Sequence, residues 1–202
     1  AFAIPIIEQI LRKHADNLDE VKSTLYVVLS PTRELAQQTY KVFLQFGADL
    51  NIKSACIIGG EDMEKQKKLI AKGSHVLIAT PGRLKDLIKQ KIVDLSTCSG
   101  VVFDEADRLF DMGFKKDIEF ILSKANTNRQ LIMVSATTNL DVLNTAHKFK
   151  SHPTELKLNE DSLLVANINH EIAMVTRNEK FPLLVNLLRS QEDAYTIVFC
   201  NT

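Results

Sequence analysis

Short apolar runs alternate with longer segments of helical periodicity along most of the chain. The runs are rich in Val and Ile and are apolar on both faces, which is typical of strands that helices cover on each side. The expected strands are residues 25–30, 54–58, 76–79, 101–103, 131–134 and 197–199, and the main expected helices are residues 34–46, 115–124, 139–149 and 179–189. This order of strand, helix and strand predicts an α/β fold with a doubly wound parallel sheet and helices on both faces.

The pattern breaks after residue 150, at Pro153 and the polar group 159–162. We expect an edge strand at 155–158 to complete a first domain over residues 1–158. A linker would follow at 159–170, and residues 171–202 would begin a second domain. We expect both ends of the chain to be cut, because the first residues enter an amphipathic helix partway and the last ones stop at the end of an apolar run.

Composition excludes several classes of protein. Hydrophobic residues make up 45% and charged residues 25%, as in ordinary soluble domains, and no apolar run approaches the length of a membrane span. The 25 basic residues balance the 25 acidic ones, so nucleic-acid binding must rest on local placement of groups. Three scattered cysteines in apolar surroundings predict buried free thiols in a reducing compartment, so we expect an intracellular protein, cytoplasmic, nuclear or nucleolar, that is not secreted.

Polar motifs directly follow four of the expected strands. They are Pro31–Ala36, Thr80–Leu84, Asp104–Asp107 and Ser135–Thr137. The carboxyl ends of parallel strands lie along one edge of a sheet, and open α/β sheets bind their ligands there. The sequence therefore predicts that all four motifs converge on one surface.

The acidic motif suits a metal ion. Its three carboxylates within four residues repel one another unless a cation or hydrogen-bond donors offset them. An apolar strand that ends in an acid, here Asp104, can hold Mg²⁺ near nucleotide phosphates, and the next acid, Glu105, can orient or deprotonate a water molecule. A solvated acidic turn that caps the following helix is the alternative explanation.

The two motifs that contain arginine suit phosphate groups. Each combines a hydroxyl, a backbone made rigid or approachable by Pro or Gly, and a guanidinium at a helix start. Ordinary turn chemistry and N-capping would account for the same residues. Gly59 and Gly60 allow a backbone to approach a ligand closely or simply form a flexible turn, and Ser135 and Thr137 alone indicate only local hydrogen bonds.

Taken together and in order, these residues resemble the DEAD-box family of RNA helicases, of superfamily two. The match includes the literal Asp104-Glu105-Ala106-Asp107 within 101–114, together with Pro31–Gln37, Gly59–Gly60, Thr80–Leu84 and Ser135–Thr137. The resemblance implies that residues 1–158 form most of a first RecA-like domain. It also implies that 197–202 begin the first motif of a second RecA-like domain.

The resemblance implies an ATP-dependent RNA helicase with ATP and Mg²⁺ as cofactors. By this analogy Asp104 coordinates Mg²⁺ through water, Glu105 activates the hydrolytic water, and Asp107 bonds to Ser135 and Thr137 to link the nucleotide state to RNA binding. The residues expected to hold the RNA backbone are Pro31, Thr32, Arg33, Gly59, Gly60, Thr80, Pro81, Gly82 and Arg83. The expected partners are single-stranded RNA and short duplexes of any sequence, with protein cofactors in a ribonucleoprotein, no membrane, and a monomeric protein.

The chain also departs from the family pattern. It has no glycine-rich loop ending in Gly-Lys-Thr and no adenine-reading Gln motif, both of which we expect upstream of Ala1. We therefore expect these 202 residues alone to hydrolyse ATP negligibly. An ATP-gated RNA clamp with little unwinding is the main alternative function. A DNA helicase of a sister family is disfavoured because Asp107 stands where that family has His.

Overall fold

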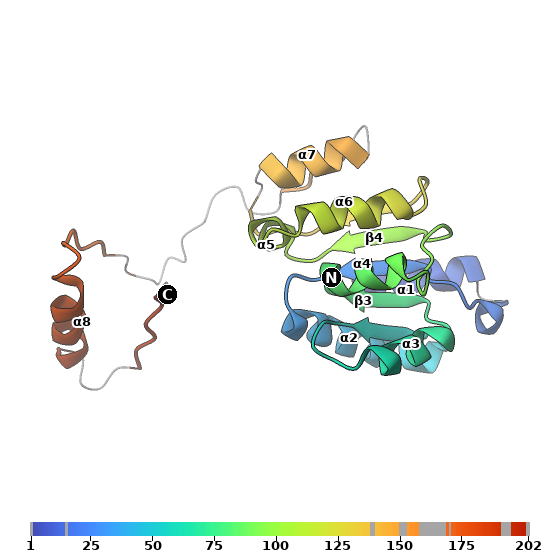
Figure 1. Cartoon of the computed structure of the whole chain (residues 1–202), viewed down its shortest axis with the longest axis horizontal. Helices are drawn as coiled ribbons and strands as arrows, with labels where there is room; N and C mark the ends of the chain where they lie inside the picture. The colour runs from blue at the N-terminus through green and yellow to red at the C-terminus, as the bar shows by residue number, and fades with distance from the viewer. Residues whose placement is uncertain are drawn as a thin grey trace. The chain divides into compact units, whose positions relative to one another are not determined.

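The chain folds into two separate units. The computed structural model describes residues 2–14, 16–137, 140–149, 153–157, 169, 171–190 and 195–200. One unit spans Ala1–Thr154 and contains the sheet, and the other spans Glu155–Thr202 (Figure 1). Each unit is described by itself below.

The first unit is built on five parallel strands. They are β1 (Tyr26–Leu29), β2 (Ser54–Ile57), β3 (Val76–Ala79), β4 (Gly100–Phe103) and β5 (Gln130–Met133). Their order in the sheet is β2-β3-β1-β4-β5, and every neighbouring pair is parallel. The parallel sheet and five of the six expected strands are confirmed.

Helices cover both faces of this sheet (Figure 1). They are α1 (Ala3–His14), α2 (Arg33–Gly47), α3 (Met63–Ala71), α4 (Pro81–Lys89), α5 (Ala106–Asp111), α6 (Lys115–Lys124) and α7 (Leu140–Phe149), with short 3₁₀ turns η1 (Leu18–Glu20) and η2 (Ala48–Leu50).

Alternate residues of each strand point to opposite faces, which divides the core in two. On one face Val28 packs with Ile6 of α1 and Phe43 of α2. On the other face Val27 belongs to a cluster that includes Leu84 of α4 and Ile121 of α6. All these side chains are fully or almost fully buried, which explains why the strands are apolar on both sides. The doubly wound architecture is confirmed.

The pairing register brings the strand ends to one level. Leu29 at the end of β1 pairs with Ala79 of β3 and with Phe103 of β4. The outer strands continue this level, since Ile57 pairs with Ala79 and Met133 pairs with Phe103. The residues that follow all five strands therefore leave the sheet along a single edge.

The second unit contains α8 (Lys180–Arg189), within the helix expected at 179–189. The strands expected at 155–158 and 197–199 were wrong for the residues that the structure describes, since 155–157 and 197–199 are not paired in a sheet. A strand needs a hydrogen-bonded neighbour, and no such neighbour occurs in the described part of this unit. All of the linker expected at 159–170 except Asn169 lies outside the described residues.

All three cysteines are free thiols, but only Cys98 is fully buried. Cys56 is half-buried, and Cys200 is exposed because the segment around it packs into no sheet. Burial raises the pKa of Cys98 to about 11, so this thiol stays protonated and inert. Among the described helices, none is both long and apolar enough to cross a bilayer.

Candidate functional site

The acidic motif forms the turn between β4 and α5. The backbone N–H of Asp104 donates to the carbonyl of Leu29 at 2.9 Å, and that of Ala106 donates to Val134 at 2.9 Å. Glu105 between them has φ of +51°, in the left-handed region that costs a residue with a Cβ about 1 kcal/mol. The turn is thus fastened on both sides, to the ends of β1 and β5.

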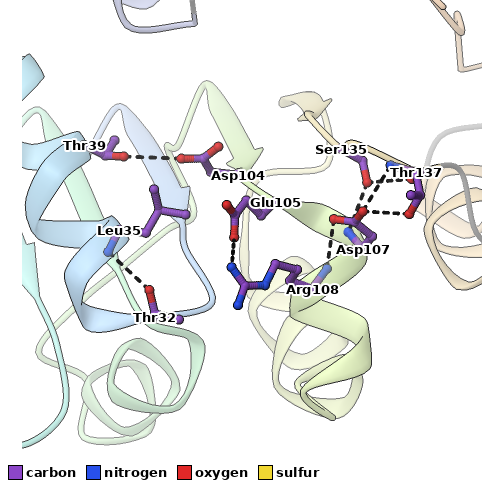
Figure 2. A network of polar contacts seen from close by, with 9 residues as sticks. All are labelled: Thr32, Leu35, Thr39, Asp104, Glu105, Asp107, Arg108, Ser135 and Thr137. Atoms are coloured by element: carbon purple, nitrogen blue, oxygen red, sulfur yellow. Dashed lines mark hydrogen bonds and ion pairs between the residues drawn. The ribbon is translucent and has the colours of Figure 1, made fainter. Parts of the chain in front are cut away.

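Asp104 is a half-buried carboxylate beside a neutral donor. The hydroxyl of Thr39 in α2 donates to its Oδ2 at 3.3 Å (Figure 2). Burial raises the pKa of Asp104, the Thr39 hydrogen bond lowers it in part, and the negative charge of Glu105 raises it further. Within the described residues no Lys or Arg forms an ion pair with it. A bound cation would offset this desolvated charge.

These features fit Mg²⁺ held by few protein groups. Across the described ranges no group of three or more His, Cys, Asp or Glu could hold a metal ion. Mg²⁺ commonly takes one or two carboxylates and completes its shell with water and substrate phosphates. Asp104 alone can therefore supply the protein ligand for such an ion.

Glu105 forms an exposed ion pair with Arg108 one turn further along. Arg108 Nη1 lies 2.9 Å from Glu105 Oε2, and the two side chains are 59% and 39% exposed (Figure 2). Exposed pairs contribute only about 0–1 kcal/mol because water screens them. The Glu105 carboxylate can therefore leave Arg108 for another partner at little cost.

Asp107 joins the turn after β4 to the turn after β5. Its Oδ2 accepts hydrogen bonds from the Thr137 hydroxyl at 2.7 Å and the Thr137 backbone N–H at 3.1 Å. Its own backbone N–H donates to Ser135 Oγ at 3.2 Å, and that hydroxyl donates to the Thr137 carbonyl at 2.7 Å (Figure 2). The three residues thus form a closed network.

The charge state of Asp107 follows from this network. Burial by itself raises the pKa of Asp107, but hydrogen bonds from Thr137 and from the backbone N–H of Arg108 outweigh it and leave the pKa below its ordinary value. Asp107 is therefore ionised at neutral pH. Since an ionised acceptor makes stronger hydrogen bonds than a neutral one, the charge tightens the link between the two turns.

Arg33 and the two glycines come together at the β1 and β2 ends. Thr32 caps α2 by accepting from the Leu35 N–H at 3.2 Å, and Pro31 before it is buried. The Arg33 guanidinium lies over Gly60, where an added Cβ would come within 2.8 Å of Arg33 Cζ. Gly60 has φ of +82°, so the backbone favours glycine here, and an added side chain would also have to displace the Arg33 guanidinium.

The turn after β3 supplies the remaining polar groups. Thr80 begins α4 without capping it through its hydroxyl, which leaves that hydroxyl available to a ligand. Pro81 is buried, and Gly82 beside it is half-buried. The Arg83 guanidinium donates to Gln66 Oε1 and to the Glu61 carbonyl, each at 3.1 Å. Arg83 is therefore partly engaged by protein groups, whereas the Arg33 guanidinium donates no hydrogen bond to any described residue.

The structure places every predicted site residue on the carboxyl edge of the sheet, as the register requires. Sequence reasoning missed three contributors: Thr39, Arg108 and Gln66. Thr39 gave a usable signal, because it lies on the buried face of α2 with Ala36 and Phe43, where a hydroxyl needs a partner. No comparable signal marked the other two, since each sits in a polar stretch.

A doubly wound α/β domain with an acid pair and basic turns on one edge is the type that nucleotide hydrolases use. Residues 1–146 match the family model described as DEAD/DEAH box helicase. The chain belongs to this family, and its first unit has the family's RecA-like fold.

Curated relatives and solved structures agree with this assignment. The chain is 40% identical to the ATP-dependent RNA helicase RhlB of Xanthomonas oryzae and 35% identical to the DEAD-box ATP-dependent RNA helicase CshA of Bacillus licheniformis, in each case over its whole length. It spans 36% and 40% of those two proteins. A DEAD box protein from Methanococcus jannaschii superposes over 100% of this chain and 52% of its own, with 33% identity and a TM-score of 0.69.

Proposed function

We propose that the protein is an ATP-dependent RNA helicase that holds the RNA backbone without sequence preference and separates short duplexes. The observation that carries the proposal is the shared edge: the register sets the acidic turn and both arginine-bearing turns at the same level. A ligand bound along this edge would contact the acidic turn and the arginine-bearing turns together. The named activity of the relatives supports the same assignment.

We assign the nucleotide chemistry to the acidic turn. Asp104 would hold Mg²⁺, which when bound neutralises charge on the phosphates of ATP. Glu105 would leave Arg108 and orient or deprotonate the attacking water. Asp107, through Ser135 and Thr137, would carry changes in the acidic turn to the end of β5, because hydrogen bonds join these three residues.

We assign RNA binding to the neighbouring turns. The free guanidinium of Arg33, the peptide groups of Gly59 and Gly60, and the hydroxyl of Thr80 are donors suited to phosphate and ribose oxygens. Pro31, Thr32, Pro81 and Gly82 would shape these turns, and the Arg83 donors that the protein leaves free would add a further contact. Such contacts contain no group that reads a base edge, which accounts for the proposed lack of sequence preference.

A strand-displacement assay on a short RNA duplex tests the proposal in the full-length protein. We expect ATP-dependent release of the labelled strand, with competition by unlabelled RNA and little competition by DNA of the same sequence. ATP binding without any strand release would favour an RNA clamp. Equal competition by DNA would count against the 2′-hydroxyl contacts.

A further inference from the structure

The buried side chain of Gln66 holds the turn that contains Gly59 and Gly60, which we call the glycine turn. Gln66 of α3 is 4% exposed, although its sequence neighbours Glu64, Lys65, Lys67 and Lys68 are charged and mostly exposed. Its Nε2 donates to the Ile58 carbonyl at 2.9 Å and reaches Glu61 Oε2 at 3.5 Å. Ile58 immediately precedes Gly59–Gly60, and Glu61 immediately follows.

Arg83, from the turn after β3, donates hydrogen bonds to both Gln66 and the glycine turn. Its Nη1 donates to Gln66 Oε1 at 3.1 Å, and its Nη2 donates to the Glu61 carbonyl at 3.1 Å. The chemistry fixes the orientation of the Gln66 amide, because a reversed amide would set its NH₂ against the guanidinium and its oxygen against the Ile58 carbonyl. Thus the carbonyls on both sides of the glycine pair are held, one by Gln66 and one by Arg83.

The glycine turn is therefore contacted by arginine side chains on two sides. Arg33 covers Gly60 on one side, and Arg83 with Gln66 holds the flanking carbonyls. A pre-formed binding turn does not have to be ordered when its ligand arrives, so it binds more tightly than a flexible one. Removal of the Gln66 amide would leave the buried Ile58 carbonyl without this donor and would free the turn to rearrange.

We propose that Gln66 is a positioning residue that couples the Gly59–Gly60 turn to the Thr80–Arg83 turn and so sets the spacing of the RNA-backbone contacts. The inference rests on the proposed RNA-binding role of these turns. Gln66 is 4% exposed and its amide is bonded to protein groups, so its proposed role is to hold the two turns rather than to contact a ligand. Its loss should weaken the apparent affinity for RNA and leave the ATP site unchanged.

The test compares three variants of the full-length protein. Gln66→Leu removes all the amide contacts, and Gln66→Glu keeps an acceptor for Arg83 but loses the donor to Ile58. Gln90→Leu makes the same chemical change at the exposed end of α4 and serves as the matched control. ATP turnover is titrated with oligouridine and, separately, with ATP. Hydrogen–deuterium exchange is measured on the peptide that contains residues 58–62.

We expect Gln66→Leu to raise the KM for oligouridine about tenfold, the effect of roughly one lost hydrogen bond to a charged group. The KM for ATP and the saturated kcat should stay within about twofold. Gln66→Glu should show a smaller rise and Gln90→Leu none. Exchange at residues 58–62 should become faster in Gln66→Leu while exchange in α2 stays unchanged.

Unchanged exchange at residues 58–62, or a parallel rise in the KM values for RNA and ATP, would overturn the positioning role. If the unsubstituted protein shows no RNA-stimulated turnover, the proposed function fails instead, and the exchange measurement still decides whether Gln66 holds the turn. Should Gln66→Leu fail to fold, Gln66→Glu provides the same two measurements.

Discussion

Thr137 donates two hydrogen bonds to a single oxygen of Asp107, one from its hydroxyl at 2.7 Å and one from its backbone N–H at 3.1 Å. The two residues are 30 positions apart in the chain and follow adjacent strands, β4 and β5. Asp107 is 8% exposed and ionised, so both Thr137 donors bond to a charged acceptor, which makes stronger hydrogen bonds than a neutral one. These bonds tie the turn after β4 to the turn after β5.

Replacement of Thr137 by Val tests the strength of this link. The change keeps the shape and the backbone donor but removes the hydroxyl, so the free energy of unfolding should fall by about 1–2 kcal/mol. Urea denaturation of the 202-residue chain measures the difference, with Thr97→Val as an exposed control. If both variants have the same stability as the parent, the Asp107–Thr137 bond contributes nothing to the fold.

Arg33 should bind RNA through charge alone. In the full-length protein Arg33→Gln should weaken the binding of RNA oligonucleotides of every sequence by a similar factor. It should also reduce the slope of log K against log[salt] by about one. Arg12→Gln is the matched control, because Arg12 pairs with Glu8 near the end of α1 that leads into the opposite edge of the sheet. A loss confined to certain base sequences would contradict the backbone contact.

His75 makes the stability of the sheet depend on pH. Its Nδ1 accepts from the Lys53 N–H at 3.1 Å and its Nε2 lies 3.0 Å from the Val21 carbonyl, which requires the neutral ring with a proton on Nε2. Burial lowers the pKa of His75 below its ordinary 6.5, with partial opposition from the hydrogen bond to Val21. The folded protein therefore binds fewer protons than the unfolded chain in mildly acidic solution.

The free energy of unfolding should thus fall as the pH drops below about 6.5, by at most about 1.4 kcal/mol per pH unit, until the folded-state pKa is passed. His75→Gln can keep one acceptor and one donor without titrating, so it should reduce this slope between pH 7 and 5. Urea unfolding at several pH values measures both slopes. Equal slopes in the two proteins would exclude His75 as the cause.

Much of this architecture could be predicted from sequence because its strands are covered on both sides. A run such as Val76–Ala79 has no polar residue to suggest another structure, and the motif after each run marks where its strand ends. The parallel order then requires the motifs to share an edge. The edge strand expected at 155–158 is not formed at the described residues 155–157, since a short alternating pattern carries no information about whether a neighbour is present to pair with it.

The contacts within the site were harder to predict. The sequence does not show that Arg83 turns toward α3 while Arg33 stays free, because both occur in similar turns at helix starts. That difference depends on where the buried Gln66 amide lies, and its position is set by the packing of α3 beside β2. Likewise the Glu105–Arg108 pair depends on the left-handed backbone of Glu105, which no local residue preference requires.

We infer that the turn after β4 performs the hydrolytic chemistry on an edge of the sheet that also binds RNA. The most direct measurement is the ATP turnover of the full-length protein, with and without saturating single-stranded RNA, before and after Glu105→Gln. We predict that RNA stimulates the parent and that the substitution lowers RNA-stimulated turnover at least about a hundredfold while ATP still binds. ATP turnover that does not change when RNA is added, or that is the same after Glu105→Gln, would contradict this assignment.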